Sequence, residues 1–374
     1  MTYGTLLADA VQNTAGDVSS GLYGFKNRII NGDMRIDQRN AGASVTAGSG
    51  YTFFVDRFKI YSAASSKLSG QQVASSYAGF PSALRLTSLA ATSPAAGDEY
   101  ELYHNIEGYN ITDLAWGTAA AKPITLSFVV NSSLTGTFAG CINNNSFGGT
   151  NTCYVFTYAV NVANTDTLIT VTIPGPTSGS WGTTNGTGMQ VIWDLGSGSG
   201  FNSTAGSWGT GFKTRTSGSV TLVGTSGATF QITGVQLEKG TQATSFDFRS
   251  IGTELALCQR YYEKSYNVGT APGTVTTQGS RYSSGSSGGL TTSFLADSVS
   301  YKVPKRSRGN TLTVWDNGGN ANVVTRHNYG VLSTNSSAAM VGPTVNDEIG
   351  FDIYSSGSAN AMVISYQWTC SSEL

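Results

Sequence analysis

The fold is decided by stretches such as Thr229-Phe230-Gln231-Ile232-Thr233-Gly234-Val235-Gln236-Leu237. Apolar residues take alternate positions at Phe230 and Ile232, and again at Val235 and Leu237. A period of two places alternate side chains on opposite faces of a β-strand, and β-branched and aromatic residues favour that conformation. The stretch is therefore predicted to be a strand.

Similar stretches lie on both sides of it and predict an all-β chain. They are separated by links rich in Gly, Ser and Asn, such as 143–145 and 197–200. Regular short strands with such links favour an antiparallel sandwich, here a jelly roll. The other predicted strands are 125–130, 168–173, 189–193 and 219–223, followed near the end of the chain by 311–315, 349–354 and 362–368.

One predicted helix, at 252–262, interrupts the strands. Its apolar side chains, among them Leu255, Leu257 and Cys258, cover more than one face, so we expect it to lie between two β domains. The expected division of the chain is an N-terminal anchoring or oligomerisation segment (1–24), a jelly-roll sandwich (25–249), the linking helix (250–266) and a C-terminal β domain (267–374).

Residues 1–24 differ from the rest of the chain. Leu7, Ala10 and Val11 stand at helical spacing, and Asn13-Thr14-Ala15-Gly16 ends the pattern. A helix this short is not stable alone. The segment is either a frayed terminus or an element that binds symmetry mates or another protein.

Charge is scarce in this chain. Charged residues make up 11% of it, against roughly 25% in soluble proteins. Its surface must be wetted by hydroxyl and amide groups, and such neutral surfaces associate readily. A net charge of −1 provides no field for nucleic acid. The start of the chain does not resemble an export signal and no stretch is long enough to span a membrane, so neither nucleic acid nor membrane is an expected partner.

No set of residues matches a catalytic template, so no enzymatic activity is expected. His104 and His327 fall in different predicted domains, without a nucleophile placed for either. Glycan cleavage needs two carboxyl groups a fixed distance apart, and the acidic cluster at 98–101 is expected in a solvated turn that leads into a strand. Other acids lie among arginines and indicate charge pairing: Asp33, Asp37 and Asp56, with Arg28, Arg35, Arg39 and Arg57.

Two further groups have structural interpretations. The basic run at 302–308 is interpreted as a turn or strand-edge device in preference to a nucleic-acid patch, because charge on an edge blocks stray pairing. The cysteines lack the Cys-x-x-Cys spacing of a metal site. Cys141 and Cys153 could face each other across a hairpin, and a disulfide between them is left open.

Trp181 and Trp208 are the candidate contact residues. Each stands in the sequence Gly-Ser-Trp-Gly-Thr, in a predicted loop of the kind that often displays binding residues. Their rings could stack on a glycan. Alternatively, each plugs an end of the sandwich or makes a subunit contact.

Several stretches resemble phage tail-fibre and virion structural proteins. They occur in the order found in that family and span residues 27–374. They are 27–39 (Asn-Arg-Ile-Ile-Asn-Gly-Asp-Met-Arg-Ile-Asp-Gln-Arg), 54–58 (Phe-Val-Asp-Arg-Phe), 230–240 with 243–246, 255–266 (with Gln-Arg-Tyr-Tyr-Glu-Lys) and the ending at 366–374.

The resemblance implies a carbohydrate-binding-module-like jelly roll in a bacteriophage appendage. The expected function is a structural virion subunit, such as a tail fibre, that contributes to host-surface attachment and is made in the host cytoplasm without a signal peptide. Residues 1–24 would join other virion proteins or start a homotrimer, and a host glycan is the candidate ligand. The alternatives are a collar or capsid fibre with a purely structural role, a glycan-depolymerising tailspike and a secreted bacterial carbohydrate-binding module.

Jelly rolls of this kind often hold a structural calcium near the first and last strands. Asn31-Gly32-Asp33 is a plausible opening half of such a site. The closing half, at 232–235, has no acidic residue, and calcium prefers several carboxylate oxygens. No metal or other cofactor is therefore expected.

Overall fold

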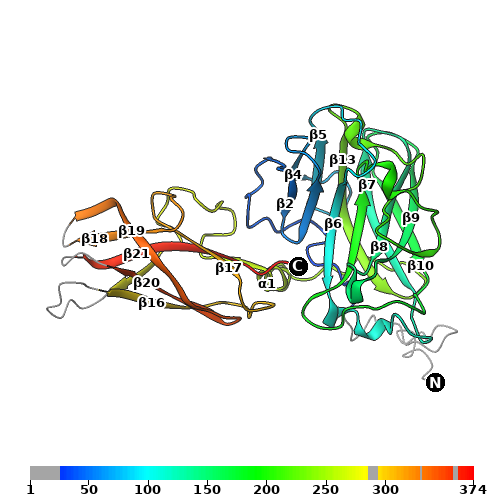
Figure 1. Ribbon diagram of the computed structural model, residues 1–374. Coiled ribbons are helices and arrows are strands. Elements are labelled where there is room, and N and C mark those ends of the chain that lie inside the picture. Colours follow the sequence, from blue (N-terminus) through cyan, green and yellow to red (C-terminus); the bar gives the residue numbers. More distant parts are fainter. Residues whose placement is uncertain (1–25, 285–293, 329–330, 357–360) are drawn as a thin grey trace, which may run out of the picture.

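The computed structural model describes residues 26–284, 294–328, 331–356 and 361–374. The predicted N-terminal segment 1–24 lies outside them. The described chain is all-β: two antiparallel sheets form a sandwich, followed by one short α-helix and a further C-terminal sheet (Figure 1). The predicted fold class is confirmed.

The first sheet of the sandwich has six strands in the order β1-β4-β5-β13-β7-β10. The opening stretch of the sequence lies in its centre as β13 (Thr229–Lys239), between β5 and β7. Phe230 and Ile232 are buried in the core, as the alternation predicts. The remaining strands are β1 (Val45–Thr46), β4 (Leu68–Ala74), β5 (Ser82–Ser88), β7 (Ile124–Ser132) and β10 (Thr167–Ile173).

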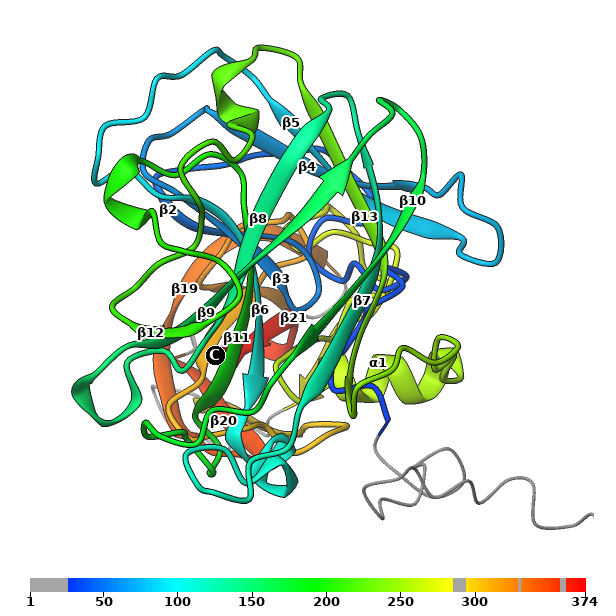
Figure 2. The same ribbon diagram turned by 90° about the vertical axis from the view of Figure 1, so that its right-hand side faces the viewer.

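The second sheet has seven strands in the order β12-β9-β8-β11-β6-β3-β2 and packs against the first (Figure 2). The chain crosses between the two sheets repeatedly, and neighbouring strands are antiparallel in both. Its strands are β2 (Gly50–Val55), β3 (Phe58–Ser62), β6 (Tyr100–Glu107), β8 (Gly136–Asn143), β9 (Thr152–Val160), β11 (Thr187–Asp194) and β12 (Trp208–Thr210).

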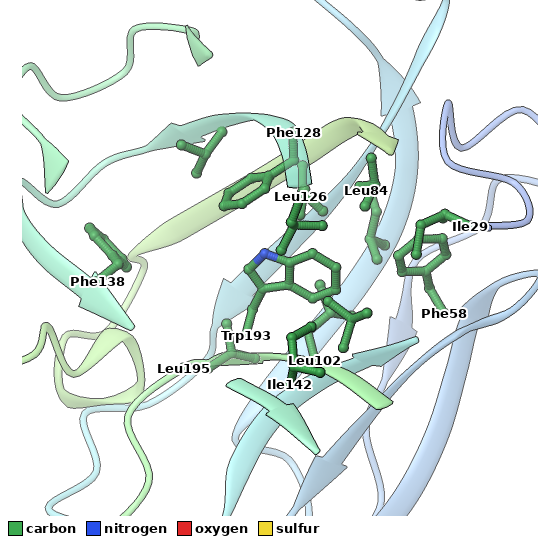
Figure 3. Packing of buried hydrophobic residues seen from close by; sticks show 14 of the residues in the cluster. Ile29, Phe58, Leu84, Leu102, Leu126, Phe128, Phe138, Ile142, Trp193 and Leu195 are labelled. Atoms are coloured by element: carbon green, nitrogen blue, oxygen red, sulfur yellow. The ribbon is translucent and has the colours of Figure 1, made fainter. Parts of the chain in front are cut away.

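The core of the sandwich lies between these sheets, around Trp193. Its side chain is fully buried, and its ring centroid lies 5.7 Å from that of Phe128 in an edge-to-face contact. Leu102 and Leu195 lie beside the indole (Figure 3). Large rings of this kind contribute much of the buried apolar area that stabilises a core.

The predicted strand at 219–223 is wrong. The chain forms a 3-10 turn, Leu222–Gly224, in its place. Leu222 and Val223 are buried, and the N–H of Val223 donates to the carbonyl of Leu195 at 3.0 Å. The segment therefore closes an end of the core without joining a sheet. The other 3-10 turns are Gly108–Asn110, Thr112–Leu114, Phe147–Gly149 and Ser199–Phe201.

The helix α1 (Ile251–Gln259) is shorter than predicted. Ser250 caps its start by accepting a hydrogen bond from the N–H of Thr253. It ends early because Tyr262 is already extended and pairs with Ser371 in the C-terminal sheet. Within the described residues, the helices lack the length and apolar character that a membrane span requires.

The C-terminal sheet is antiparallel and is organised around β21 (Ala361–Ser371), which pairs with β14, β15, β17 and β18. Ile364, Tyr366 and Trp368 are buried on one face of β21, as their spacing predicts. The other strands are β14 (Tyr262–Lys264), β15 (Arg281–Ser284), β16 (Phe294–Ser300), β17 (Thr311–Trp315), β18 (Val323–Asn328), β19 (Val331–Asn346) and β20 (Gly350–Ser356).

Candidate functional site

The sandwich meets α1 and the C-terminal sheet near the end of the chain (Figure 1). Charged side chains from both sides pair there. Charged side chains are scarce in this chain, so a place where several of them form pairs is the candidate functional site. We call it the junction network. It consists of Arg39, Arg57, Lys59, Asn105, Glu107 and Asn185 of the sandwich, with Arg260, Tyr261, Arg306, Glu373 and Leu374 on the other side.

Two arginines of the sandwich hold Glu373. Its carboxylate lies 2.8 Å from Arg39 and also pairs with Arg57. The same guanidinium groups stack over aromatic rings, Arg39 at 3.7 Å from the centroid of Tyr262 and Arg57 at 3.6 Å from that of Tyr261. Each arginine therefore binds the second unit through both a charge pair and a cation–π contact.

The last residue of the sequence is held as well. The Nζ of Lys59 donates to the main-chain oxygen of Leu374 at 2.6 Å, and the Nδ2 of Asn105 donates to it at 2.8 Å. Burial lowers the pKa of Lys59 to about 8, against the opposing effect of the Glu373 carboxylate. The ammonium is still mostly charged at neutral pH and can make this charge-assisted bond.

Glu107, at the end of β6, binds the residues that follow α1. Arg260 donates to it in a bidentate arrangement, at 2.8 Å from Nε and 2.6 Å from Nη2. The hydroxyl of Tyr261 donates to the same carboxylate at 2.7 Å. These contacts raise the pKa of Arg260, because the carboxylate favours its charged form.

Arg306 connects three segments. It donates to the carbonyls of Ser372 at 2.9 Å, Glu373 at 3.0 Å and Asn185 at 2.9 Å. Its neighbour Lys305 is fully enclosed. The run 302–308 lies in bends between β16 and β17, in agreement with the turn interpretation. The alternative of a strand-edge device is wrong for Lys305 and Arg306, because both make contacts inside the molecule.

The stretch at 27–39 folds against the junction through amide side chains. Asn31 donates to the carbonyls of Ile36 at 2.8 Å and Asp56 at 2.9 Å. The main-chain N–H of Gln38 donates to the carboxylate of Asp56 at 3.0 Å, and its Nε2 donates to the carbonyl of Tyr262 at 2.9 Å. Burial raises the pKa of Asp56 to about 6, with Arg39 acting against the shift. Local polar bonds thus fix the arginines that face Glu373.

At the suggested calcium position the acidic side chain is paired with an arginine. The main chains of Gly32 and Val235 do meet there, with the N–H of Val235 donating to Gly32 at 2.9 Å. The carboxylate of Asp33, however, pairs with the guanidinium of Arg35, which confirms the predicted charge pairing at this point. In the described part of the chain, no three His, Cys, Asp or Glu side chains gather where they could bind a metal ion.

Trp181 and Trp208 belong to one aromatic cluster at an end of the sandwich. Their ring centroids are 5.6 Å apart, and both pack edge to face on Trp116, at 4.6 and 5.4 Å. Trp181 is only 6% exposed, whereas Trp208 is partly buried and donates from Nε1 to the carbonyl of Pro174 at 2.7 Å. A glycan or subunit contact by this pair stays a prediction, and Trp208 is the member with exposed surface for it.

The acidic cluster at 98–101 is not simply a solvated turn. Glu101 lies in β6, fully buried, directly opposite Asp194 of β11. It accepts hydrogen bonds from the hydroxyls of Tyr103 and of Ser197, the latter at 3.1 Å. Burial raises its pKa to about 8 and that of Asp194 to about 6. Two carboxyl groups converge here, but both are closed to a substrate.

The cysteines are free and buried. In the β8–β9 hairpin Cys141 is opposite Val155, whereas Cys153 is opposite Asn143. The two thiols are thus diagonal neighbours on adjacent strands, a separation that a disulfide does not span without movement of the backbone. The disulfide that the sequence left open is not formed.

Sequence reasoning missed Glu107, Arg306 and Glu373. A usable signal was present in stretch 27–39, which carries part of the family resemblance and contains three arginines but only two aspartates. Scarce charges that recur in such stretches must find partners elsewhere in the chain, because buried charges are paired.

No known protein-family model matches this chain, and no curated protein matches it. Solved structures match it at low identity. The enzymatically active domain of tailspike protein 4 of bacteriophage CBA120 is 12% identical, with a TM-score of 0.29, over 57% of this chain and 21% of that one.

Two carbohydrate-binding structures match as well. A family 11 module of Clostridium thermocellum, in complex with a mixed-linked tetrasaccharide, is 12% identical over 53% of this chain and 100% of that one, with a TM-score of 0.26. The tandem CBM22 domain of Paenibacillus barcinonensis Xyn10C is 8% identical over 90% and 92%, with a TM-score of 0.28. At these values the matches carry no functional argument.

Proposed function

We propose that this protein is a non-enzymatic structural subunit of a bacteriophage virion appendage, a tail fibre or a related fibre. One observation carries the proposal: the stretches that resemble phage appendage proteins, at 27–39, 54–58, 255–266 and 366–374, meet in the junction network. They join two β units instead of lining a cleft.

Such a junction restricts the movement of the two β units relative to each other. Domains in one chain move relative to each other by default, unless their interface is large or strongly bonded. Here buried charge pairs, cation–π contacts and the apolar cluster of Ile30, Ile36, Cys258 and Tyr261 act together. A fixed angle between its parts is what a fibre needs in order to carry the orientation of a particle to its tip.

Two observations favour a role without catalysis. Glu101 and Asp194 are enclosed, so a glycan cannot reach them. His104 is also buried, and desolvation lowers its pKa well below its usual range, which keeps it neutral. The tailspike alternative would require carboxyl groups open to a substrate.

The remaining parts of the proposal concern assembly. Residues 1–24 anchor the subunit to the particle, the mature protein resides in the virion, and three copies form the fibre. Sedimentation at micromolar concentration tests the last point, since a stable monomer would remove the trimer.

Electron microscopy of purified phage particles tests the main proposal. Antibody fragments raised against the C-terminal sheet are expected to decorate a tail appendage. Decoration of the collar or capsid would support the purely structural fibre, and absence of the protein from washed particles would overturn the proposal.

A further inference from the structure

An open hollow of about 290 Å³ lies at one end of the sandwich. Three loops surround it: the β5–β6 loop, the loop that follows β11, and the loop before β13. Its lining has no carboxylate and one cation, and consists otherwise of hydroxyl, amide and main-chain groups: Pro94, Ser197, Gly198, Ser199, Asn202, Arg215, Ser217, Gly218 and Thr221.

The guanidinium of the single cation is buried in the wall of the hollow. Arg215 is 7% exposed, donates to the carbonyls of Ser197 and of Ser219, the latter at 2.8 Å, and lies 3.7 Å from Asp194. Its Nη2 also donates to the Oγ1 of Thr221 at 3.2 Å. The hollow therefore offers no free charge to a ligand.

Its shape is fixed before any ligand arrives. Ser197 accepts the N–H of Tyr100 at 3.0 Å, and its own hydroxyl donates to buried Glu101 at 3.1 Å. Gly198 packs so closely that a Cβ there would lie 1.8 Å from the carbonyl oxygen of Ala95. Only glycine fits this contact, which joins two of the three loops. A site held in this way loses little entropy on binding.

Three side chains at the hollow have unused hydrogen-bonding groups. Ser199, Asn202 and Ser217 make no side-chain hydrogen bond within the described part of the chain, and Ser199 and Ser217 are exposed. Hydroxyl and carboxamide groups each donate and accept. Pro94, partly buried, adds one apolar ring.

We infer that this hollow binds a single neutral sugar unit of a glycan. A sugar presents hydroxyl groups that both donate and accept around an apolar ring face, which matches the uncharged polar lining and Pro94. An anionic sugar is disfavoured, because the guanidinium of Arg215 already donates to main-chain carbonyls in the wall of the hollow and lies beside the carboxylate of Asp194. The inference goes beyond the structural role in the proposed function and rests on that function only for the source of the glycan.

Ligand-observed NMR on the full chain tests the inference. The probes are glucose, galactose, mannose and N-acetylglucosamine, with glucuronate and N-acetylneuraminate as charged counterparts. We expect at least one neutral sugar to bind with a dissociation constant on the order of 1 mM, as ligand efficiency allows for so small a ligand.

Variants locate the binding. Ser217→Trp fills the hollow and should weaken binding by about tenfold or more, and Asn202→Ala should weaken it without adding bulk. Gln242→Trp, which adds the same ring at an exposed position in the loop after β13 and outside the hollow, should leave it unchanged. Failure of every neutral sugar to bind, or equal binding by S217W and wild type, would overturn the inference. Both outcomes leave the location of the protein on the particle untouched, so they are distinguishable from failure of the proposed function.

Discussion

The ammonium of Lys305 lies 2.6 Å from the carboxylate of Glu263, and both side chains are fully enclosed. Lys305 also donates to the carbonyls of Gln259 at 2.6 Å and Val303 at 2.8 Å, so each of its three protons has an acceptor. Burial lowers the pKa of Lys305, while Glu263 acts in the opposite direction. This pair connects the end of α1 to the segment that runs along the C-terminal sheet.

Removal of the ammonium should destabilise the fold strongly. Lys305→Met leaves the carboxylate of Glu263 buried without its cation, which costs about 3–5 kcal/mol in free energy of unfolding. Urea denaturation measures the loss. Lys302→Met, in the same basic segment of the chain, is the matched control. Lys302 is exposed, so this substitution should change the free energy of unfolding by no more than about 0.5 kcal/mol. Equal midpoints for the two variants would show that the pair does not matter.

Glu101→Gln should make stability less sensitive to pH. Burial raises the pKa of Glu101 from 4.5 in the unfolded chain to about 8 in the folded protein. The stabilisation that the neutral carboxyl group gives to the fold is therefore complete below pH 4.5 and is lost as the pH rises through 8. Glutamine keeps the neutral form at all pH values. The stability of E101Q relative to wild type should therefore rise between pH 5 and pH 8.5, by roughly 2–4 kcal/mol.

Urea denaturation at the two pH values measures this difference. Glu348→Gln, at an exposed carboxyl group, is the control and should show a flat difference. If E101Q and wild type changed in parallel with pH, Glu101 would have to be ionised in the folded state at neutral pH.

The tryptophan pair should respond unequally to truncation. Trp181→Ala removes a buried ring and should cost about 3–5 kcal/mol. Trp208→Ala should cost less, because its ring is partly exposed. Thermal unfolding compares the two, and a larger loss at Trp208 would contradict the described packing.

All four cysteines should behave as enclosed thiols. Burial raises the pKa of Cys141 and of Cys258 well above the usual range, and both thiols are inaccessible. Ellman's reagent should detect almost none in the native protein and four per chain in urea without reductant. A count of two in urea would require a disulfide.

The strands could be predicted from the sequence because a period of two is a local signal, as at 229–237 and 362–368. The junction could not, since its partners are far apart: Arg57 and Glu373 are separated by 316 positions. The cluster at 98–101 was misplaced for a related reason. Composition suggests that carboxyl groups face water, whereas the loop that covers Glu101 comes from residues around Ser197 and Thr214, which only the tertiary fold brings there.

Disruption of the junction network should release the C-terminal sheet without unfolding the sandwich. Arg57→Ala removes both the charge pair to Glu373 and the contact with Tyr261. The sandwich keeps its own core, so its unfolding transition should remain cooperative. Limited proteolysis near 240–250 should become faster in R57A than in wild type, whereas Arg308→Ala, at an exposed ion pair, should have no effect.

The distance distribution between the two units tests the central claim most directly. Spin labels at Thr225→Cys on the sandwich and Thr311→Cys on the C-terminal sheet occupy exposed positions, and the native thiols are buried. Pulsed dipolar electron paramagnetic resonance should give one narrow distance in the otherwise wild-type chain and a broad distribution when Arg57→Ala is added. A broad distribution in the otherwise wild-type chain would contradict a fixed junction and, with it, the structural role proposed for this protein.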